Sequence, residues 1–112
     1  MRKPENKEKR RIRTAIYRKE NPLICLFSHY KCNAKSKGIE FHLTKNDFRK
    51  FWQLPCHYCG ISIETIGLDR VDNERGYFID NVVPCCRTCN FMKKNHQESF
   101  FIEHCKRIAN RF

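Results

Sequence analysis

Residues 56–60 read Cys-His-Tyr-Cys-Gly, and residues 85–90 read Cys-Cys-Arg-Thr-Cys-Asn. Each stretch contains a Cys-x-x-Cys pair, formed by Cys56 with Cys59 and by Cys86 with Cys89. Two such pairs supply the four thiolates that a tetrahedral structural zinc site requires at Zn–S distances of about 2.3 Å. Residues 60–85 separate the pairs, whereas four-cysteine sites usually have a linker of about 15–20 residues. We therefore predict a zinc site with an additional structural element between its two halves.

Two other interpretations are that these cysteines are ordinary buried thiols or that they form disulfides. Disulfides are typical of secreted proteins, and we find no secretory signal in the sequence. A chain of 112 residues has room for one modest core, and domains of this size are often stabilised by a metal. Cys85 could replace Cys86 as the first cysteine of the second pair, but only Cys86 is separated from Cys89 by two residues. We therefore expect Cys85 to be a spare thiol.

Charge is distributed unevenly along the chain. The net charge is +11 and the sequence pI is near 9.5, which indicates a soluble protein that binds a polyanion. No apolar run approaches the roughly 20 residues of a membrane span, so we expect no membrane contact. Residues 56–90 nevertheless carry five acids and three bases, a net −2, while the remainder carries +13. An acidic centre between basic flanks favours a cation at the centre and phosphates around it.

We divide the chain into a basic N-terminal arm at 1–20, a helical lead-in with a short strand at 21–55, and a core with a C-terminal helix at 56–112. The arm has nine bases and three acids, with almost nothing apolar before Ile12. Such a segment cannot form a core of its own. We expect a frayed arm or an exposed helix that contacts an anionic surface such as DNA, the alternative being a solubilising tail.

The lead-in begins with helix signals. Pro22 suits the first helical position and Gly38 a helix end, and apolar residues recur between them at helical spacing. Within this helix we expect Cys25 and Cys32 to be small core residues and His29 to be exposed.

A strand and a second helix complete the lead-in. Residues 39–43 alternate as a short strand, and Thr44 with Asp47 resembles a capping box that opens the next helix. Three aromatic residues of this helix have helical spacing, which favours core packing over base stacking. They are Phe48, Phe51 and Trp52.

The third segment predicts a β-hairpin that leads into a helix. Residues 67–71 and 81–84 read as strands, and the second cysteine pair opens the helix. A last helix over 97–110 is expected to pack one apolar side inward. That side carries Phe100, Phe101, His104, Cys105 and Ile108.

A hairpin followed by a helix can hold a divalent ion between an acid on its first strand and an amide on its helix. Asp69 interrupts an apolar strand and supplies a charged oxygen, and Asn90 supplies a neutral one. Two protein oxygens leave positions for water and phosphate, as hard cations prefer. Because Asn90 directly follows Cys89, zinc at the cysteines would orient its side chain.

These residues resemble a known family. The runs Leu68-Asp69-Arg70 and Asn81-Val82-Val83-Pro84-Cys85-Cys86, followed by Cys89-Asn90 and Lys93 and preceded by Cys56-x-x-Cys59-Gly60, are similar to the HNH (ββα-metal) endonucleases. The resemblance is strongest to small phage-type members with a four-cysteine zinc site, and it covers residues 56–94 closely. It implies a small zinc-stabilised α+β domain in which a ββα-metal motif is flanked by helices.

The resemblance also implies roles for single residues. It makes Asp69 and Asn90 ligands of the catalytic divalent ion, and it makes Asn81 the residue that braces the hairpin loop. Arg70 stands where the family usually has a histidine general base, and arginine cannot lose its proton near neutral pH. Since some members share the Asp-Arg pair, we expect Arg70 to clamp the scissile phosphate. The proton must then go elsewhere, and the candidates are His42, His57, Tyr58, His96 and bulk hydroxide.

We therefore expect a metal-dependent DNA endonuclease that hydrolyses phosphodiester bonds, by nicking or by double-strand cleavage, as homing-type enzymes do. The expected cofactors are structural Zn²⁺ and catalytic Mg²⁺ or Mn²⁺. The expected partner is double-stranded DNA, bound by a monomer or a homodimer in the cytoplasm of a bacterium or a phage-infected cell. The main alternative is a catalytically degenerate, zinc-stabilised DNA-binding module, and a more distant one is a role on RNA.

Overall fold

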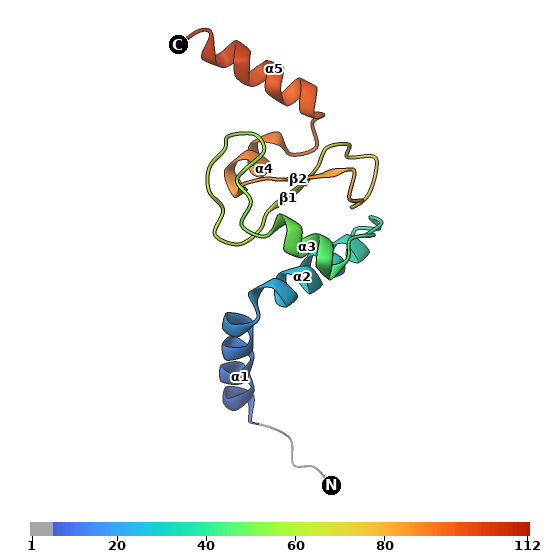
Figure 1. Ribbon diagram of the computed structural model, residues 1–112, viewed down its shortest axis with the longest axis vertical. Helices are drawn as coiled ribbons and strands as arrows, with labels where there is room; N and C mark the ends of the chain where they lie inside the picture. Colours follow the sequence, from blue (N-terminus) through green and yellow to red (C-terminus); the bar gives the residue numbers. More distant parts are fainter. Residues whose placement is uncertain (1–5) are drawn as a thin grey trace.

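The computed structural model describes residues 6–112, so residues 1–5 of the predicted arm lie outside the described part. Within that part the chain forms five helices and one two-stranded sheet (Figure 1). In chain order the elements are α1 (Lys7–Glu20), α2 (Pro22–Ser36), α3 (Lys45–Phe51), β1 (Leu68–Arg70), β2 (Val82–Pro84), α4 (Arg87–Lys93) and α5 (Glu98–Ala109). The predicted α+β class is confirmed.

The molecule is elongated, with principal extents of 67 × 29 × 23 Å. α1 and α5 extend from opposite ends of a central body that contains the sheet, α3 and α4 (Figure 1). The radius of gyration is 17.6 Å, against about 13 Å for a compact chain of this length. Neither terminal helix has a buried residue, so both add surface rather than core. Among residues 6–112 no helix is long and apolar enough to cross a membrane.

Local signals define the first two helices. The Asn6 side chain caps α1 by accepting a hydrogen bond from the Glu8 amide at 2.8 Å. α2 begins at Pro22, and Gly38 follows its end with φ +69°, a left-handed conformation that glycine adopts without strain. The predicted helix between Pro22 and Gly38 is confirmed.

The capping box before α3 is confirmed, but the strand before it is not. The Thr44 amide donates to Asp47 Oδ2 at 2.9 Å, and the Asp47 amide donates to Thr44 Oγ1 at 3.1 Å. The strand predicted at 39–43 is wrong, because only Phe41 forms an isolated parallel bridge, with Tyr77. Tyr77 lies in the hairpin loop and offers a single residue for pairing, so the ladder cannot extend.

β1 and β2 form the predicted antiparallel hairpin, in which Asp69 lies opposite Val83. Backbone hydrogen bonds extend the pairing at each end, from Val71 to Asn81 and from Cys85 to Gly67, both at 2.9 Å. A Cβ atom at Gly67 would overlap the Cys85 carbonyl group. Glycine at this position therefore lets the hairpin approach the second cysteine pair closely.

The apolar core lies where α2, α3 and the hairpin meet. Its buried members are Phe27, Leu43, Phe48, Ile66, Leu68 and Val82. The Phe48 ring is fully buried, with edge contacts to Phe27 at 5.4 Å and to Tyr30 at 5.5 Å between centroids. The Tyr30 hydroxyl accepts a hydrogen bond from the Leu68 amide at 3.2 Å, which ties α2 to β1. The three aromatic residues of the second predicted helix do pack in or against this core, as expected.

Two predictions about packing are wrong. Cys32 is exposed on α2, and Cys25 is only half-buried. On α5, Phe100 and Ile108 are 54% and 48% exposed, so the apolar side predicted for this helix does not enter a core. α5 lies at the end of the molecule, where the Phe101 ring meets Tyr58 edge-on at 5.4 Å and Glu98 bonds His57 at 2.8 Å. Helical spacing identified an amphipathic face without showing that the fold leaves it uncovered.

Replacing Phe48 with alanine should lower the free energy of unfolding by about 3–5 kcal/mol, because a fully buried ring leaves a cavity. Phe112→Ala is the matched control, since Phe112 is completely exposed at the chain end. Urea unfolding followed by the fluorescence of the single tryptophan, Trp52, measures both variants. Equal midpoints for the two variants would show that Phe48 does not anchor the core.

Candidate functional site

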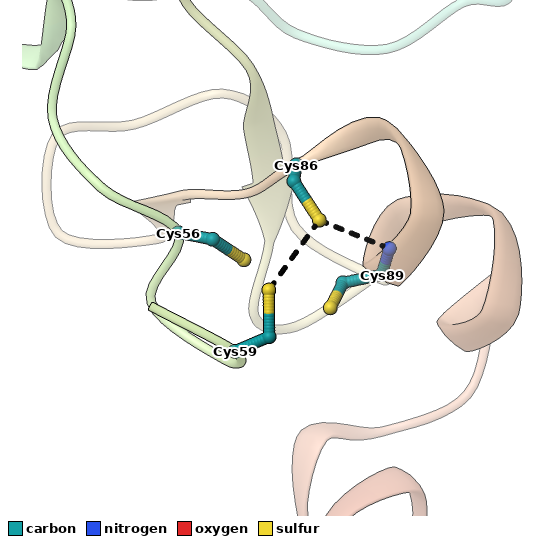
Figure 2. Close-up of side chains that lie close together, drawn as sticks. All are labelled: Cys56, Cys59, Cys86 and Cys89. Atoms are coloured by element: carbon teal, nitrogen blue, oxygen red, sulfur yellow. Dashed lines mark hydrogen bonds between the residues drawn. The ribbon is translucent and has the colours of Figure 1, made fainter. Parts of the chain in front are cut away.

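The four paired cysteines converge on one point. Cys56 and Cys59 come from the loop before the hairpin, Cys86 directly precedes α4, and Cys89 lies in its first turn (Figure 2). Their sulfur atoms all lie within 4.8 Å of one another. In a regular tetrahedron with Zn–S bonds of about 2.3 Å, the sulfurs are about 3.8 Å apart. The Sγ atoms of Cys59 and Cys86 are 3.7 Å apart, so the cluster fits a structural zinc ion.

The backbone around each cysteine pair explains why the sulfurs converge. In the first pair, the Gly60 amide donates to the Cys56 carbonyl at 2.9 Å, and Gly60 has φ +77°, which favours glycine. In the second pair, Cys86 is the N-cap of α4, and its sulfur accepts a hydrogen bond from the Cys89 amide at 3.3 Å. Tight turns at both pairs therefore aim the four side chains at one point.

Electrostatics at the cluster also favours a cation. Burial opposes ionisation of Cys56, but backbone N–H groups, first among them that of Cys59, lower the pKa of Cys56 to about 6. Burial raises the pKa of Cys89, and the thiols of the other three cluster cysteines add to this effect. Thiolates held this close repel one another, and a divalent cation removes that repulsion.

Cys85 is separate from the cluster, as predicted. It is buried, and its sulfur contacts the Cys86 carbonyl oxygen at 3.4 Å. Burial, with the nearby Asp69 charge, raises the pKa of Cys85, so its thiol stays neutral. It packs with the cluster as an apolar residue.

Asp69 lies on β1, and its carboxylate is 4% exposed. The Tyr58 hydroxyl donates to Asp69 Oδ2 at 2.7 Å. The Lys93 ammonium lies 3.1 Å from Asp69 Oδ2 and 3.4 Å from Oδ1, and it also reaches the Arg70 carbonyl oxygen at 3.3 Å. Lys93 is fully buried, so this ammonium is held by one ion pair with the carboxylate and by hydrogen bonds to Asp69 Oδ1 and the Arg70 carbonyl oxygen.

Each half of the zinc site thus sends one side chain to Asp69. Tyr58 lies between the cysteines of the first pair, and Lys93 lies one helical turn after Cys89 on the same face of α4. Lys93 belongs to the sequence motif, but the motif alone predicts no role for it. Its spacing of four residues from a metal-ligand cysteine was the signal that places it on the buried face.

The Arg70 side chain points away from the Asp69 carboxylate, as alternation along a strand requires. Its Nη1 donates to the carbonyl oxygens of Asn73 at 2.9 Å and Arg75 at 2.8 Å, and its guanidinium lies over the Tyr77 ring. Burial raises the pKa of Tyr77, and the Arg70 charge opposes the increase. Arg70 therefore joins the strand to the hairpin loop.

Asn81 is buried at the base of the same loop. Its Nδ2 donates to the carbonyl oxygens of Asp72 at 3.0 Å and Gly76 at 2.9 Å, and its Oδ1 accepts from the Asp72 amide at 2.9 Å. These three bonds use one side chain to close the loop on itself. Asn90 differs, because its side chain is exposed on α4, next to Cys89 and three residues before Lys93.

The four candidate proton acceptors lie in different surroundings. His57 bonds Glu98 at 2.8 Å, His42 stacks on Phe78, and His96 stacks on Phe100. Of the four, Tyr58 is the one bonded to Asp69. Burial and the Asp69 carboxylate raise the pKa of Tyr58, so the phenol keeps its proton in this arrangement.

Comparison with solved structures identifies the fold. The structure resembles that of the rare-cutting HNH restriction endonuclease PacI with a TM-score of 0.64 and 24% sequence identity, over 80% of this chain and 78% of that one. The chain has an HNH endonuclease fold. Together with the four-cysteine cluster, this likeness confirms the zinc-stabilised ββα architecture that the sequence motif predicted.

Comparison with sequences adds a viral relative. The uncharacterised protein R423 of Acanthamoeba polyphaga mimivirus is 41% identical over 88 residues, which is 77% of this chain. The match spans only 17% of the length of R423. No protein-family model matches the chain. The HNH assignment therefore depends on the shared fold and on the residues of the motif.

Cys56→Ser and Cys89→Ser should each lose the zinc ion and much of the folded structure, because binding energy at such a site is folding energy. Cys85→Ser is the matched control and should retain one zinc per chain. Elemental analysis and circular dichroism of the three purified variants measure both effects. A folded wild-type protein without zinc, or zinc loss in Cys85→Ser alone, would contradict this assignment.

Proposed function

We propose that this protein is a metal-dependent endonuclease that hydrolyses phosphodiester bonds in double-stranded DNA. The observation that carries the proposal is the buried Asp69 carboxylate, which faces α4 across the ββα unit of an HNH fold. A buried carboxylate costs free energy, and in this fold a metal-binding role accounts for keeping one. The net charge of +11 supports a DNA substrate.

Oxygen donors on β1 and α4 fit a hard divalent cation such as Mg²⁺ or Mn²⁺. Asp69 would supply the charged ligand and Asn90 a neutral one. Tyr58 and Lys93 occupy part of the Asp69 carboxylate, whose two oxygens together offer about four acceptor positions. When bound, the cation supplies polarisation of the phosphate and stabilisation of the leaving oxygen.

The other residues of the motif would organise the substrate. Asn81 holds the hairpin loop closed, and Arg70 is anchored to that loop by its Nη1. In this proposal the guanidinium reorients or uses its remaining donors to bind the scissile phosphate, where its charge stabilises the transition state. We extend the proposal to an enzyme that acts as a monomer or homodimer, nicking or cutting both strands, in a bacterial or virus-infected cell. Homing is one role compatible with it.

Purified zinc-loaded protein should nick or linearise supercoiled plasmid when Mg²⁺ or Mn²⁺ is added. Asp69→Asn should abolish cleavage and leave DNA binding nearly unchanged, because it removes the charged ligand but keeps a hydrogen-bonding partner for Lys93. Asp80→Asn, at an exposed loop position, is the matched control. Gel assays of cleavage and binding test the proposal, and an Asp69→Asn variant as active as wild type would refute it.

The runner-up is a DNA-binding module that has lost catalysis, and the engagement of Arg70 with loop carbonyls favours it. Arg70→Ala should slow an active enzyme by about 10²–10³, the usual cost of losing a group that stabilises transition-state charge. Arg70→His separates the two functions in the plasmid assay. An inert wild type beside an active Arg70→His variant would establish the module; a wild type that cuts excludes it.

α1 is the surface that we propose for non-specific DNA contact. Seven of its residues are basic and two are acidic. One of its faces is formed by Lys7, Arg10, Arg11, Thr14, Ala15 and Arg18. The small side chains of Thr14 and Ala15 would let the lysine and arginine side chains on either side of them approach DNA phosphates.

Replacing Arg11 and Arg18 with alanine should reduce the salt dependence of duplex binding by about 0.9 in logarithmic slope per lost phosphate contact. The control replaces Lys9 and Lys19 with alanine. These substitutions remove the same charge, and both residues lie outside the face described above. Binding titrations over a range of salt concentrations measure both slopes. Equal slopes for the two double variants would mean that α1 does not present this face to DNA.

A further inference from the structure

The Lys93 ammonium lies beside the Asp69 carboxylate, where a metal cation would otherwise bind. This ammonium lies 3.1 and 3.4 Å from the two carboxylate oxygens, and both side chains are shielded from water, at 0% and 4% exposure. An ion bound to either oxygen at an ordinary distance of 2.0–2.6 Å would lie no more than about 6 Å from this ammonium. Positive charges at that separation, away from bulk water, repel strongly.

The charges around Asp69 do not favour a divalent ion on their own. The Tyr58 hydroxyl is a neutral hydrogen-bond donor to the carboxylate, and the Lys93 ammonium cancels the carboxylate charge. Arg70 adds a further positive charge on the same strand. The side chains that contact the Asp69 carboxylate therefore leave it with no net negative charge, whereas a DNA phosphate would add one negative charge next to the ion.

We propose that Lys93 couples metal binding to DNA binding: it neutralises Asp69 in the free protein, so that the divalent ion is held tightly only when a phosphate is also present. This inference depends on the proposed nuclease function and makes Lys93 a positioning residue. Coupling is reciprocal, so the ion should strengthen DNA binding by the same factor by which DNA strengthens binding of the ion. The divalent ion therefore binds weakly at the cleavage site until DNA binds.

The position of Lys93 on α4 makes the coupling sensitive to the zinc site. Cys89 and Lys93 are both buried and lie one turn apart, so the cysteine fixes how far the lysine reaches toward β1. The lysine also bonds the Arg70 carbonyl, which holds the strand and the helix together when the carboxylate turns toward another cation. A lysine at this position can share Asp69 without unfolding the unit.

Mn²⁺ titration of the zinc-loaded protein, followed by electron paramagnetic resonance, tests the inference without cleavage. In the absence of DNA, Lys93→Gln and Lys93→Met should bind Mn²⁺ roughly tenfold more tightly or better, because they remove the competing charge. Lys93→Arg keeps the charge and should resemble wild type. Asp69→Asn should abolish this class of Mn²⁺ site in every background, and zinc content with circular dichroism establishes that each variant is folded.

Unchanged or weaker Mn²⁺ binding in folded Lys93→Gln and Lys93→Met would overturn the inference while leaving the proposed nuclease intact. If neither neutral variant folds, wild type alone decides: a short duplex oligonucleotide, shown to be uncut afterwards, should tighten Mn²⁺ binding roughly tenfold or more. No tightening would overturn the coupling. Absence of any Asp69-dependent Mn²⁺ binding, with or without duplex, would overturn the metal-dependent function itself.

Discussion

The convergence of four sulfur atoms on one point is the constraint on which the rest of this structure depends. The apolar core under α2 and α3 is small, and the elements that carry the motif are too short to be stable alone. They are a hairpin of two three-residue strands and a seven-residue helix. The cysteine cluster joins the loop before the hairpin to the helix after it. It therefore fixes the geometry of the ββα unit where hydrophobic burial is least able to do so.

The same cluster determines the surroundings of Asp69. Tyr58 reaches the carboxylate from within the first cysteine pair, and Lys93 reaches it from the helix that the second pair begins. The geometry of the cysteine cluster thus sets the distances around Asp69. The surroundings of Asp69 are otherwise held only by the two strands and by α4. A small protein gains rigidity in this way at its centre, where Tyr58, Asp69 and Lys93 meet from separate parts of the chain.

Sequence was most informative where chemistry requires fixed spacing. The paired cysteines, the capping box of Thr44 and Asp47, and the hairpin all appear where local signals predicted them. Long-range contacts were the part that spacing could not predict. The segment around Phe41 has a strand pattern but finds one pairing residue, and α5 has an apolar stripe that no other element covers. The role of Lys93 was missed because its spacing from Cys89 indicates a buried position but does not show that it meets a carboxylate 24 positions earlier.

The terminal helices have a different relation to the fold. Neither α1 nor α5 buries a side chain, so substitutions there cost the core little, whereas a change in the cysteine pairs affects everything that they hold. The two kinds of segment can consequently diverge at different rates. The two ends of the molecule can therefore change in sequence and surface chemistry while the centre keeps the structure that its cysteines hold.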